Sequence, residues 1–491
     1  MSELFENAVC LAPMVRSGTL PLRLLSLRYG ADLVYGEEIV DKRLIATTRV
    51  ANQLLDTVDY VSNNGGSSIV FRTCNEEKKK VVFQIGTADP ILALKAAERV
   101  ATDVAAIDIN MGCPKNFSLQ GGMGAALLKK PDVACDILKT LRRNLNIPVS
   151  CKIRILEDAS ATVRLLHFHA SAICLYFALI SISWQIDLAK RLEQAGAVAV
   201  GLHCRQVHER PVDDAHWEAL GPVVSSLSVP VLANGDIFVR EDIEKVRKIS
   251  GANSFLIARG ALQNASIFRE QGMLPYTDVV VDYLKAAAET DNVFQNTKYN
   301  ISRMIPTKCD ANVSGSTVTV ADLGATKNNL QMFALWDVQN YYEQTQDRFR
   351  AKAAALNLSR DDVDYSFQQP AHKYDDAFVT NQQFYCNTCK VQLLSDKDVE
   401  LHKKGKKHKK KLRSLSSSTV PEQTAQRAER QTHASETSSV EVVSRERTVE
   451  QDNADRAAKR LKREDTEAGK ILHDDDVSPS AATDEPSATT A

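Results

Sequence analysis

Eight short runs of apolar, often β-branched residues recur along the first 270 residues, and this rhythm is the strongest constraint on the fold. Several of the intervening segments have the spacing of amphipathic helices, as in 89–102 and 187–196. The runs occupy residues 9–14, 31–38, 81–86, 105–112, 148–155, 197–204, 229–236 and 254–260. Apolar strands that alternate with helices are typical of a parallel sheet covered by helices. Eight such units predict an α/β protein with a (β/α)8 TIM barrel. A doubly wound sheet is the alternative, but no early G-x-G-x-x-G follows the first run.

The remainder of the chain differs in composition from the barrel region. Residues 271–360 are more helical in character and predict a helical domain, although the stretch 311–329 does not favour one structure. Residues 361–383 resemble a linker, residues 384–413 form a small module, and residues 414–491 have the composition of a disordered tail. The predicted order is therefore a barrel at 1–270, a helical domain, a linker, a small module and a tail.

The predicted strands end in polar or otherwise unusual residues. In a TIM barrel, functional residues gather at the C-terminal ends of the strands. Those ends carry Pro13, Met14, Glu37, Glu38, Gln84, Asn110, Cys113, Lys152, Arg154, His203, Arg205, Asn234, Gly235, Asp236 and Arg259. If the strands are parallel, these residues share one rim. The alternative is that they only mark the junctions between strands and loops.

Part of this set indicates a flat cofactor that carries a phosphate. Loops after the seventh and eighth strands of a barrel are a frequent phosphate site, and here they contain the segment 234–236 and Arg259. Glycines 235 and 260 would let backbone N–H groups approach the phosphate, which Arg259 would pair with. Gln84 is placed to hydrogen-bond a ring edge, and Lys152 to stabilise negative charge on a reduced ring. Taken singly, buried Lys152 and His203 can equally be satisfied structural residues.

Cys113 lies in the stretch "DINMGCPKNFSLQGGMGAALL", residues 108–128. A buried strand needs neither the proline nor the glycines that follow this cysteine. A thiol beyond a strand end can act as a nucleophile or a general acid. The structural alternative is a cysteine that serves as a small buried apolar residue.

Several motifs resemble those of the tRNA-dihydrouridine synthases. They are "LAPMVRSGTLPLR", "VVFQIG", "DINMGCPK", "GGMGAALL", "CKIRIL" and "VLANGDI". The resemblance covers residues 8 to about 300, and "NTKYNISRMI" is similar to part of the family's helical domain. The wording is closest to the second eukaryotic subfamily, which reduces the D-loop uridine numbered 20.

The resemblance implies a chemistry and a set of site residues. FMN would be reduced by NADPH or NADH and would pass hydride to C6 of a uracil, and Cys113 would protonate C5. The implied FMN-binding residues are Pro13, Met14, Val15, Gln84, Lys152, His203, Asn234, Gly235, Asp236, Ala258 and Arg259. Asn110 and Arg154, at the ends of their strands, are predicted to bind substrate. The implied partner is tRNA, with other RNA left open, and the family suggests a monomer.

Two features depart from the family pattern. Cys204 follows His203 where the family usually has glycine, so a side chain enters that turn. The apolar run 170–184 is short for a membrane span, and removal of residues 163–185 restores an ordinary connection between the fifth and sixth strands. The segment begins with Val, whose codons all start with GT, and ends with Gln, one codon of which is CAG. Its coding sequence can therefore begin with GT and end with CAG, as an intron does. We therefore hypothesise an in-frame retained intron at 163–185, with a genuine extra helix or a membrane contact as the alternatives.

The small module contains the pattern Cys386-x2-Cys389-x12-His402-x5-His408. Two thiolates and two imidazoles at this spacing predict a tetrahedral structural Zn²⁺ site. The pattern resembles U1-like C2H2 zinc fingers, which are associated with RNA. Residues 403–413 hold eight Lys or Arg, which predicts binding to phosphates without sequence readout. The alternatives for this basic run are a solvated surface or a nuclear localisation signal.

The cysteine content and the N-terminal residues predict the compartment in which the protein occurs. The ten cysteines lack paired spacing, and the N-terminal residues lack the pattern of a secretion signal. A reducing compartment, cytoplasmic or nuclear, is therefore expected, and no membrane association. Two other functions remain open from sequence: a different flavin barrel enzyme such as a dihydroorotate dehydrogenase, and an RNA-binding protein whose barrel is catalytically idle.

Overall fold

A computed structural model describes residues 2–63, 68–156, 172–306 and 318–358, and residues 385–413 with gaps. The chain divides into two compact units, 1–382 and 383–491. The predicted linker 361–383 and tail 414–491 lie outside the described residues. No helix in the described ranges is long and apolar enough to cross a membrane.

The first unit is built on eight parallel strands that close into a barrel, which confirms the predicted fold. The strands are β1 (Val9–Leu11), β2 (Leu33–Tyr35), β7 (Val81–Gly86), β8 (Ala106–Met111), β9 (Val149–Arg154), β10 (Val200–His203), β11 (Val231–Asn234) and β12 (Ser254–Ile257). They pair in the ring order β2-β1-β12-β11-β10-β9-β8-β7, and β2 closes the ring on β7 through the register Val34↔Val81. All eight fall within the runs predicted from sequence.

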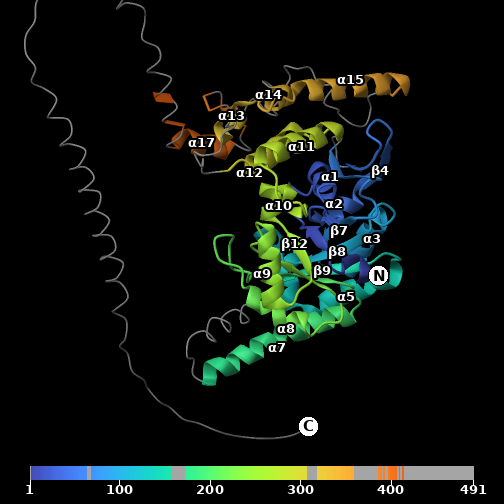
Figure 1. Ribbon diagram of the computed structural model, residues 1–491, viewed down its shortest axis with the longest axis vertical. Helices are drawn as coiled ribbons and strands as arrows, with labels where there is room; N and C mark the ends of the chain where they lie inside the picture. The colour runs from blue at the N-terminus through green and yellow to red at the C-terminus, as the bar shows by residue number, and fades with distance from the viewer. Residues whose placement is uncertain are drawn as a thin grey trace, which may run out of the picture. The chain divides into compact units, whose positions relative to one another are not determined.

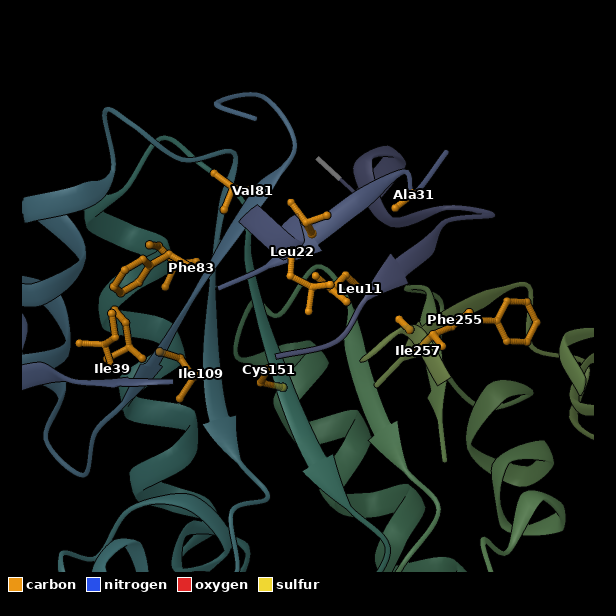
Figure 2. Packing of buried hydrophobic residues seen from close by; sticks show 14 of the residues in the cluster. Leu11, Leu22, Ala31, Ile39, Val81, Phe83, Ile109, Cys151, Phe255 and Ile257 are labelled. Atoms are coloured by element: carbon orange, nitrogen blue, oxygen red, sulfur yellow. The ribbon is translucent and has the colours of Figure 1, made fainter. Parts of the chain in front are cut away.

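Alternate residues of each strand enter two different cores. Residues such as Leu11, Phe83 and Ile109 face outward and pack against the surrounding helices in the larger hydrophobic cluster, and Figure 2 shows them among the strands and helices. The smaller cluster fills the barrel interior with Phe5, Ala8, Cys10, Ala12, Leu33, Tyr35, Val82, Ala106, Ala199, Leu232 and Leu256. Because side chains alternate along a strand, this assignment also decides which polar residues point inward.

Helices cover the outside of the barrel (Figure 1). They are α1 (Leu20–Arg28), α3 (Pro90–Val100), α5 (Pro131–Asn144), α7 (Ala172–Gln194), α8 (Leu220–Val224), α9 (Arg240–Ser250) and α10 (Arg259–Gln263). The start of α3 shows the local cause: Asp89 accepts from the N–H groups of Ile91 and Leu92, each at 2.8 Å, and Pro90 occupies the first helical position.

One feature was absent from the sequence-based prediction. Strands β4 (Thr47–Asn52), β5 (Thr57–Ser62) and β6 (Ile69–Cys74) form an antiparallel sheet outside the barrel. The Tyr60 hydroxyl donates to the Asp103 carboxylate at 2.7 Å, and Arg49 pairs with the same carboxylate. This sheet is thus fixed to the end of the α3 region. The short strand β3 (Ile39–Val40) also adds to β7.

The predicted helical region follows the barrel. It contains α11 (Tyr276–Glu289), α12 (Phe294–Met304), α13 (Val320–Ala325), α14 (Asn329–Ala334) and α15 (Gln339–Ala355). Figure 1 shows α11, α12 and α15 at the same end of the unit. The Tyr29 hydroxyl, after α1, donates to Asp282 of α11 at 2.7 Å, and the α12 side chain of Asn296 donates to the Arg16 carbonyl at 2.7 Å. These bonds tie α11 to the end of α1, and α12 to the loop after β1.

The segment 163–185 is only partly described. Residues 163–171 lie outside the described ranges, and from residue 172 the backbone is helical as the first part of α7. Of the α7 side chains that the structure describes, Trp184 is 64% exposed, whereas Gln185 and Leu188 are buried, at 2% and 5% exposed. Gln185 contributes one contact, accepting from the Leu156 N–H at 2.8 Å. Among the α7 side chains that the structure describes, those that pack on the barrel therefore begin at Gln185, the last residue of the segment.

Deletion of residues 163–185 is expected to leave a folded barrel. Because the buried side chains of α7 from Leu188 onward are retained, we expect the thermal midpoint to stay within about 4 °C of the longer protein. Thermal unfolding followed by circular dichroism measures this, and sequencing of the mature transcript tests the retained intron. The hypothesis is wrong if the main transcript carries these codons and the shortened protein fails to fold.

Candidate active site and candidate metal centre

The C-terminal half of the barrel interior is lined by polar side chains. Period-two alternation continues from the apolar interior residues, so Gln84, Asp108, Lys152, His203 and Asn234 all point inward. Strand register places them beside one another: Gln84 pairs with Asp108, and His203 with Asn234. The sequence therefore puts polar groups inside the barrel only where the strands approach their C-terminal ends.

A cavity of about 250 Å³ opens at these ends. Its lining includes Pro13, Val15, Gln84, Asn110, Cys113, Lys152, Arg154, His203, Asn234, Gly235, Asp236, Ala258 and Arg259, which are all of the predicted active-site residues except Met14. Met14 is instead partly buried against the larger hydrophobic cluster. The structure thus brings the rim residues together, and their individual roles remain predictions.

The cavity has a positive electrostatic character. Burial lowers the pKa of His203 well below its ordinary value, and the nearby charges of Lys152, Arg154, Arg205 and Arg259 lower it further. His203 is therefore neutral at physiological pH. Burial, together with the charge of Arg154, also lowers the pKa of Lys152 to about 8. Such a surrounding favours an anionic ligand.

The loop after β11 brings charged side chains together at one side of the cavity. Asp236, in the left-handed region at φ 52°, pairs with both Arg205 and Arg259. Gly235 has φ 135°, and its carbonyl accepts from the Trp217 indole N–H at 2.9 Å. Two guanidinium groups therefore converge where a cavity-bound phosphate is expected, with one carboxylate between them.

The turn that holds Cys113 explains the glycines of its motif. The Asn110 side-chain oxygen accepts from the N–H groups of Gly112 at 2.9 Å and Cys113 at 3.0 Å. Gly124 has φ 58°, and a Cβ there would lie 2.6 Å from the Cys113 carbonyl oxygen. The Ser118 hydroxyl donates to the Cys113 sulfur at 3.3 Å. The glycine-rich segment therefore folds directly against the cysteine, and its backbone leaves no room for a side chain.

Arg154 connects two loops of the rim. Its Nε donates to the Gly112 carbonyl at 3.0 Å, and its Nη1 donates to the Gln206 carbonyl at 2.7 Å. The guanidinium group therefore braces the cysteine turn against the loop after β10. The predicted contact of Arg154 with substrate would have to use its remaining N–H groups.

Three further residues belong to the site but were not assigned from sequence. Glu38 lines the cavity, and burial raises its pKa against the opposing effects of hydrogen bonding to the Cys113 and Asn110 side chains. Arg205 pairs with Asp236. Asp108 is buried beneath the cavity and is bonded to Gln84. The sequence placed Glu38 and Arg205 among the residues at strand ends but gave them no individual role. Asp108 differed from its neighbours in the sequence only as a charged residue inside an apolar strand.

The second unit contains a separate cluster of metal-ligand residues. Potential ligand atoms of Cys386, Cys389, His402 and His408 all lie within 4.8 Å of one another. The His408 Nδ1 is 3.4 Å from the Cys386 sulfur, 3.3 Å from the Cys389 sulfur and 3.2 Å from the His402 Nε2. Zn–S bonds of about 2.3 Å and Zn–N bonds of about 2.0 Å in a tetrahedron require ligand separations of roughly 3.5 Å. The donor set therefore fits zinc.

The cluster is carried by a small hairpin and a helix. Strand β13 (Tyr385–Cys386) pairs antiparallel with β14 (Val391–Gln392), and α17 (Asp396–Lys404) carries His402. Two of the clustered residues therefore come from a hairpin, and two come from a helix and its C-terminal side.

Comparison with known proteins decides the family. The dihydrouridine synthase (Dus) family matches residues 10–172 and 181–308, which is more than half of the chain. The chain belongs to the dihydrouridine synthase family. The match includes the whole barrel rim and the helices α11 and α12, and it is interrupted over residues 173–180, inside the predicted insertion.

Two yeast proteins are similar to this family member over much of its length. The tRNA-dihydrouridine(20) synthase [NAD(P)+] of Schizosaccharomyces pombe is 40% identical over 311 residues, covering 61% of this chain and 60% of the relative. The protein of the same name from Saccharomyces cerevisiae is 36% identical over 326 residues, covering 62% of this chain and 78% of the relative. Histamine dehydrogenase from Rhizobium sp. 4-9 is similar in structure at a TM-score of 0.35 and 7% identity, covering 57% of this chain and 49% of that chain, which is too low to bear on function.

Cys204, where this family member departs from the expected glycine, fits without distortion of the turn. Its side chain is fully buried, and burial raises the pKa of the thiol to about 12. The backbone keeps its bonds: Cys204 N–H donates to the Asn234 carbonyl at 2.9 Å, and His216 N–H donates to the Cys204 carbonyl at 2.7 Å. The substitution therefore leaves the loop after β10 intact.

Lys152→Met is expected to stabilise the ligand-free protein. The Lys152 pKa falls from 10.5 to about 8 on folding, so the unfolded chain binds more protons between these pH values and wild-type stability rises with pH across that window. The variant removes this penalty, which is about 2 kcal/mol at pH 7 once hydration from the cavity is allowed for. Urea unfolding at pH 7, 9 and 10.5 measures the difference, which should shrink toward zero at the highest pH.

A matched control is Lys95→Met on the exposed face of α3. This variant should change the free energy of unfolding by less than about 0.5 kcal/mol at every pH. A Lys152→Met protein that is less stable than wild type, or whose advantage does not depend on pH, would contradict the predicted cost of the buried ammonium group.

Proposed function

We propose that this chain is an FMN-dependent tRNA-dihydrouridine synthase that reduces the C5–C6 bond of a D-loop uridine, at position 20, with NADPH or NADH. The observation that carries the proposal is that one barrel-rim cavity is lined by Cys113 together with Lys152, His203 and Arg259. The family match and the names of the two yeast relatives support the substrate and the position.

The cavity suits FMN on the chemistry of its lining. The inward-facing Gln84 and Lys152 offer hydrogen bonds to a heteroaromatic ring, and the neutral His203 adds a third polar group. Arg259 and the backbone N–H groups at Gly235 would bind the phosphate. When bound, FMN supplies hydride, taken from NADPH or NADH, to C6 of the uracil. The positive surroundings, of which the Lys152 ammonium is the innermost part, stabilise negative charge on a reduced ring.

Cys113 is the proposed source of the proton that C5 receives. Its thiol is partly exposed to the cavity, and proton transfer from Sγ to C5 completes the addition of two hydrogens across the double bond. The Ser118 hydroxyl, which donates to Sγ, stabilises the thiolate that remains. General acid catalysis of this kind contributes about 10²- to 10⁴-fold to a rate.

The rim offers a surface for RNA beside the cavity. A uridine must leave its stack to enter a closed site. Val15, at the cavity mouth, is 57% exposed, and the next residue, Arg16, lies over the Tyr299 ring at 5.9 Å from its centroid. Arg303 approaches the same ring at 5.2 Å. We propose that these cationic and aromatic groups of the β1 loop and α12 contact the tRNA.

The second unit is proposed to be a zinc finger that binds RNA phosphates. The ligand geometry of Cys386, Cys389, His402 and His408 fits Zn²⁺, and eight Lys or Arg lie within residues 403–413. Lysine contacts of this type supply affinity that falls with salt and carry no sequence information. The finger would then add sequence-independent affinity for tRNA to that of the catalytic unit.

Cys113→Ala is expected to retain bound FMN and to lose activity. Because the thiol is assigned to proton transfer and not to flavin binding, the purified variant should stay yellow while dihydrouridine formation on unmodified tRNA with NADPH falls by about 10²-fold or more. Cys74→Ala, at a half-buried thiol of β6 outside the cavity, is the matched control and should keep full activity. A protein that folds without flavin and leaves tRNA unchanged would favour the idle RNA-binding alternative.

Cys386→Ser is expected to release zinc without affecting the barrel. Loss of one thiolate removes a quarter of the ligand set, so metal analysis of the full chain should fall from about one zinc per chain to near zero. Affinity for tRNA should fall, and its dependence on salt should become shallower. Flavin content should not change, and Cys74→Ser serves as the control. Retention of zinc by Cys386→Ser would exclude the proposed ligand set.

A further inference from the structure

A chain of hydrogen bonds runs from inside the barrel to the cysteine turn. Ser150 Oγ donates to Asp108 Oδ1 at 2.7 Å, and Gln84 Nε2 donates to Asp108 Oδ2 at 2.8 Å. Asn110 Nδ2 then donates to Gln84 Oε1 at 3.3 Å. The Asn110 oxygen accepts the N–H groups that form the turn at Cys113. Each link comes from one of three adjacent strands, β7, β8 and β9.

The innermost links are sealed from water. Asp108 is 1% exposed, Ser150 is 1% exposed and Gln84 is 2% exposed. Burial raises the Asp108 pKa to about 6, against the opposing effects of Gln84, Ser150 and Lys152, so the group is mostly a carboxylate at neutral pH. A buried carboxylate must be hydrogen-bonded, and here two donors satisfy it.

The direction of each amide in the chain follows from this carboxylate. An ionised carboxylate only accepts, so Gln84 must turn its NH2 group toward Asp108 and its oxygen toward Asn110. Asn110 must in turn direct its NH2 group to Gln84 and its oxygen to the turn. With either amide reversed, donors would face donors or acceptors would face acceptors, at a cost that is largest for the buried Gln84.

We propose that Asp108 is a positioning residue that fixes the orientation of the Gln84 and Asn110 amides, and through Asn110 holds the Cys113 turn in the conformation that proton transfer requires. The inference rests on the proposed function only for the role of Cys113 in proton transfer. The geometry itself concerns the protein alone. Gln84 also lines the cavity, so one carboxylate orients both a predicted cofactor contact and the cysteine.

A double-mutant cycle on Cys113 alkylation tests the proposal. The rate of carboxamidomethylation of Cys113 by iodoacetamide, resolved by peptide mass spectrometry, is measured in the full chain, in Asp108→Leu, in Asn110→Ala and in the double variant. Each single substitution releases the turn, so each is expected to raise the rate about tenfold. The double variant should react at the rate of Asn110→Ala, because Asp108 acts through Asn110.

Two further variants make the test decisive. Ser150→Ala removes a neighbour of Asp108 but leaves the carboxylate to orient Gln84, so its rate should change less than about twofold. If Asp108→Leu does not fold, Gln84→Leu takes its place in the same cycle, because it breaks the chain at the middle link. Circular dichroism confirms folding of each protein before alkylation.

The outcomes separate this proposal from the proposed function. Additive effects of the Asp108 and Asn110 substitutions, or a Ser150→Ala effect as large as that of Asp108→Leu, would overturn the positioning role. The alkylation rate requires neither flavin nor tRNA. A coupled cycle in a protein that makes no dihydrouridine would therefore refute the proposed function alone, and an additive cycle in an active enzyme would refute only the positioning role.

Discussion

The closure of the barrel between β2 and β7 is the constraint on which the other features depend. Once Val34 pairs with Val81, the alternation of every strand is fixed, and one set of side chains must point into a narrow interior. The lower part of that interior is filled by apolar residues such as Phe5 and Leu33. Polar side chains are confined to the upper part, where the strands end and the cavity opens. The site therefore exists because the sequence changes from apolar to polar on the inward face of the same strands.

The positive charges inside the barrel reduce the stability of the ligand-free fold. Lys152 is held close enough to Arg154 and to buried surroundings for its pKa to fall toward 8, and His203 is kept neutral. Gly201 on the neighbouring strand makes this possible, since a Cβ there would lie 3.1 Å from the Lys152 side chain. Groups held in unfavourable surroundings are typical of functional sites. A bound anion would offset the unfavourable burial of positive charge. A barrel without a ligand would gain nothing from these buried charges.

The sequence predicted the barrel well because both of its signals are local. Strand runs and helix spacing need only near neighbours, and all eight strands and the helical segments at 89–102 and 187–196 were predicted. The sheet β4–β5–β6 was missed because its strands alternate weakly, with exposed residues such as Arg49 between buried ones. Asp108 was missed for a different reason. Its importance comes from which side chains stand beside it across two strand pairs, and register between strands cannot be read from a single chain.

The spatial relation between the cysteine turn and the floor of the cavity is the least adjustable part of the site. The proposed addition of two hydrogens to adjacent carbons of one ring would need the donor atoms to be held within a fraction of an ångström. Gln84 on β7 and Asn110 on β8 are linked to each other, and these two strands are paired along four residues of parallel register. A loop alone would not fix Cys113 relative to the cavity floor to this degree. The Asn110 side chain, on the strand that precedes the turn, connects the turn to the rigid barrel. Arg154 of β9, the other neighbouring strand, donates a hydrogen bond to the same turn.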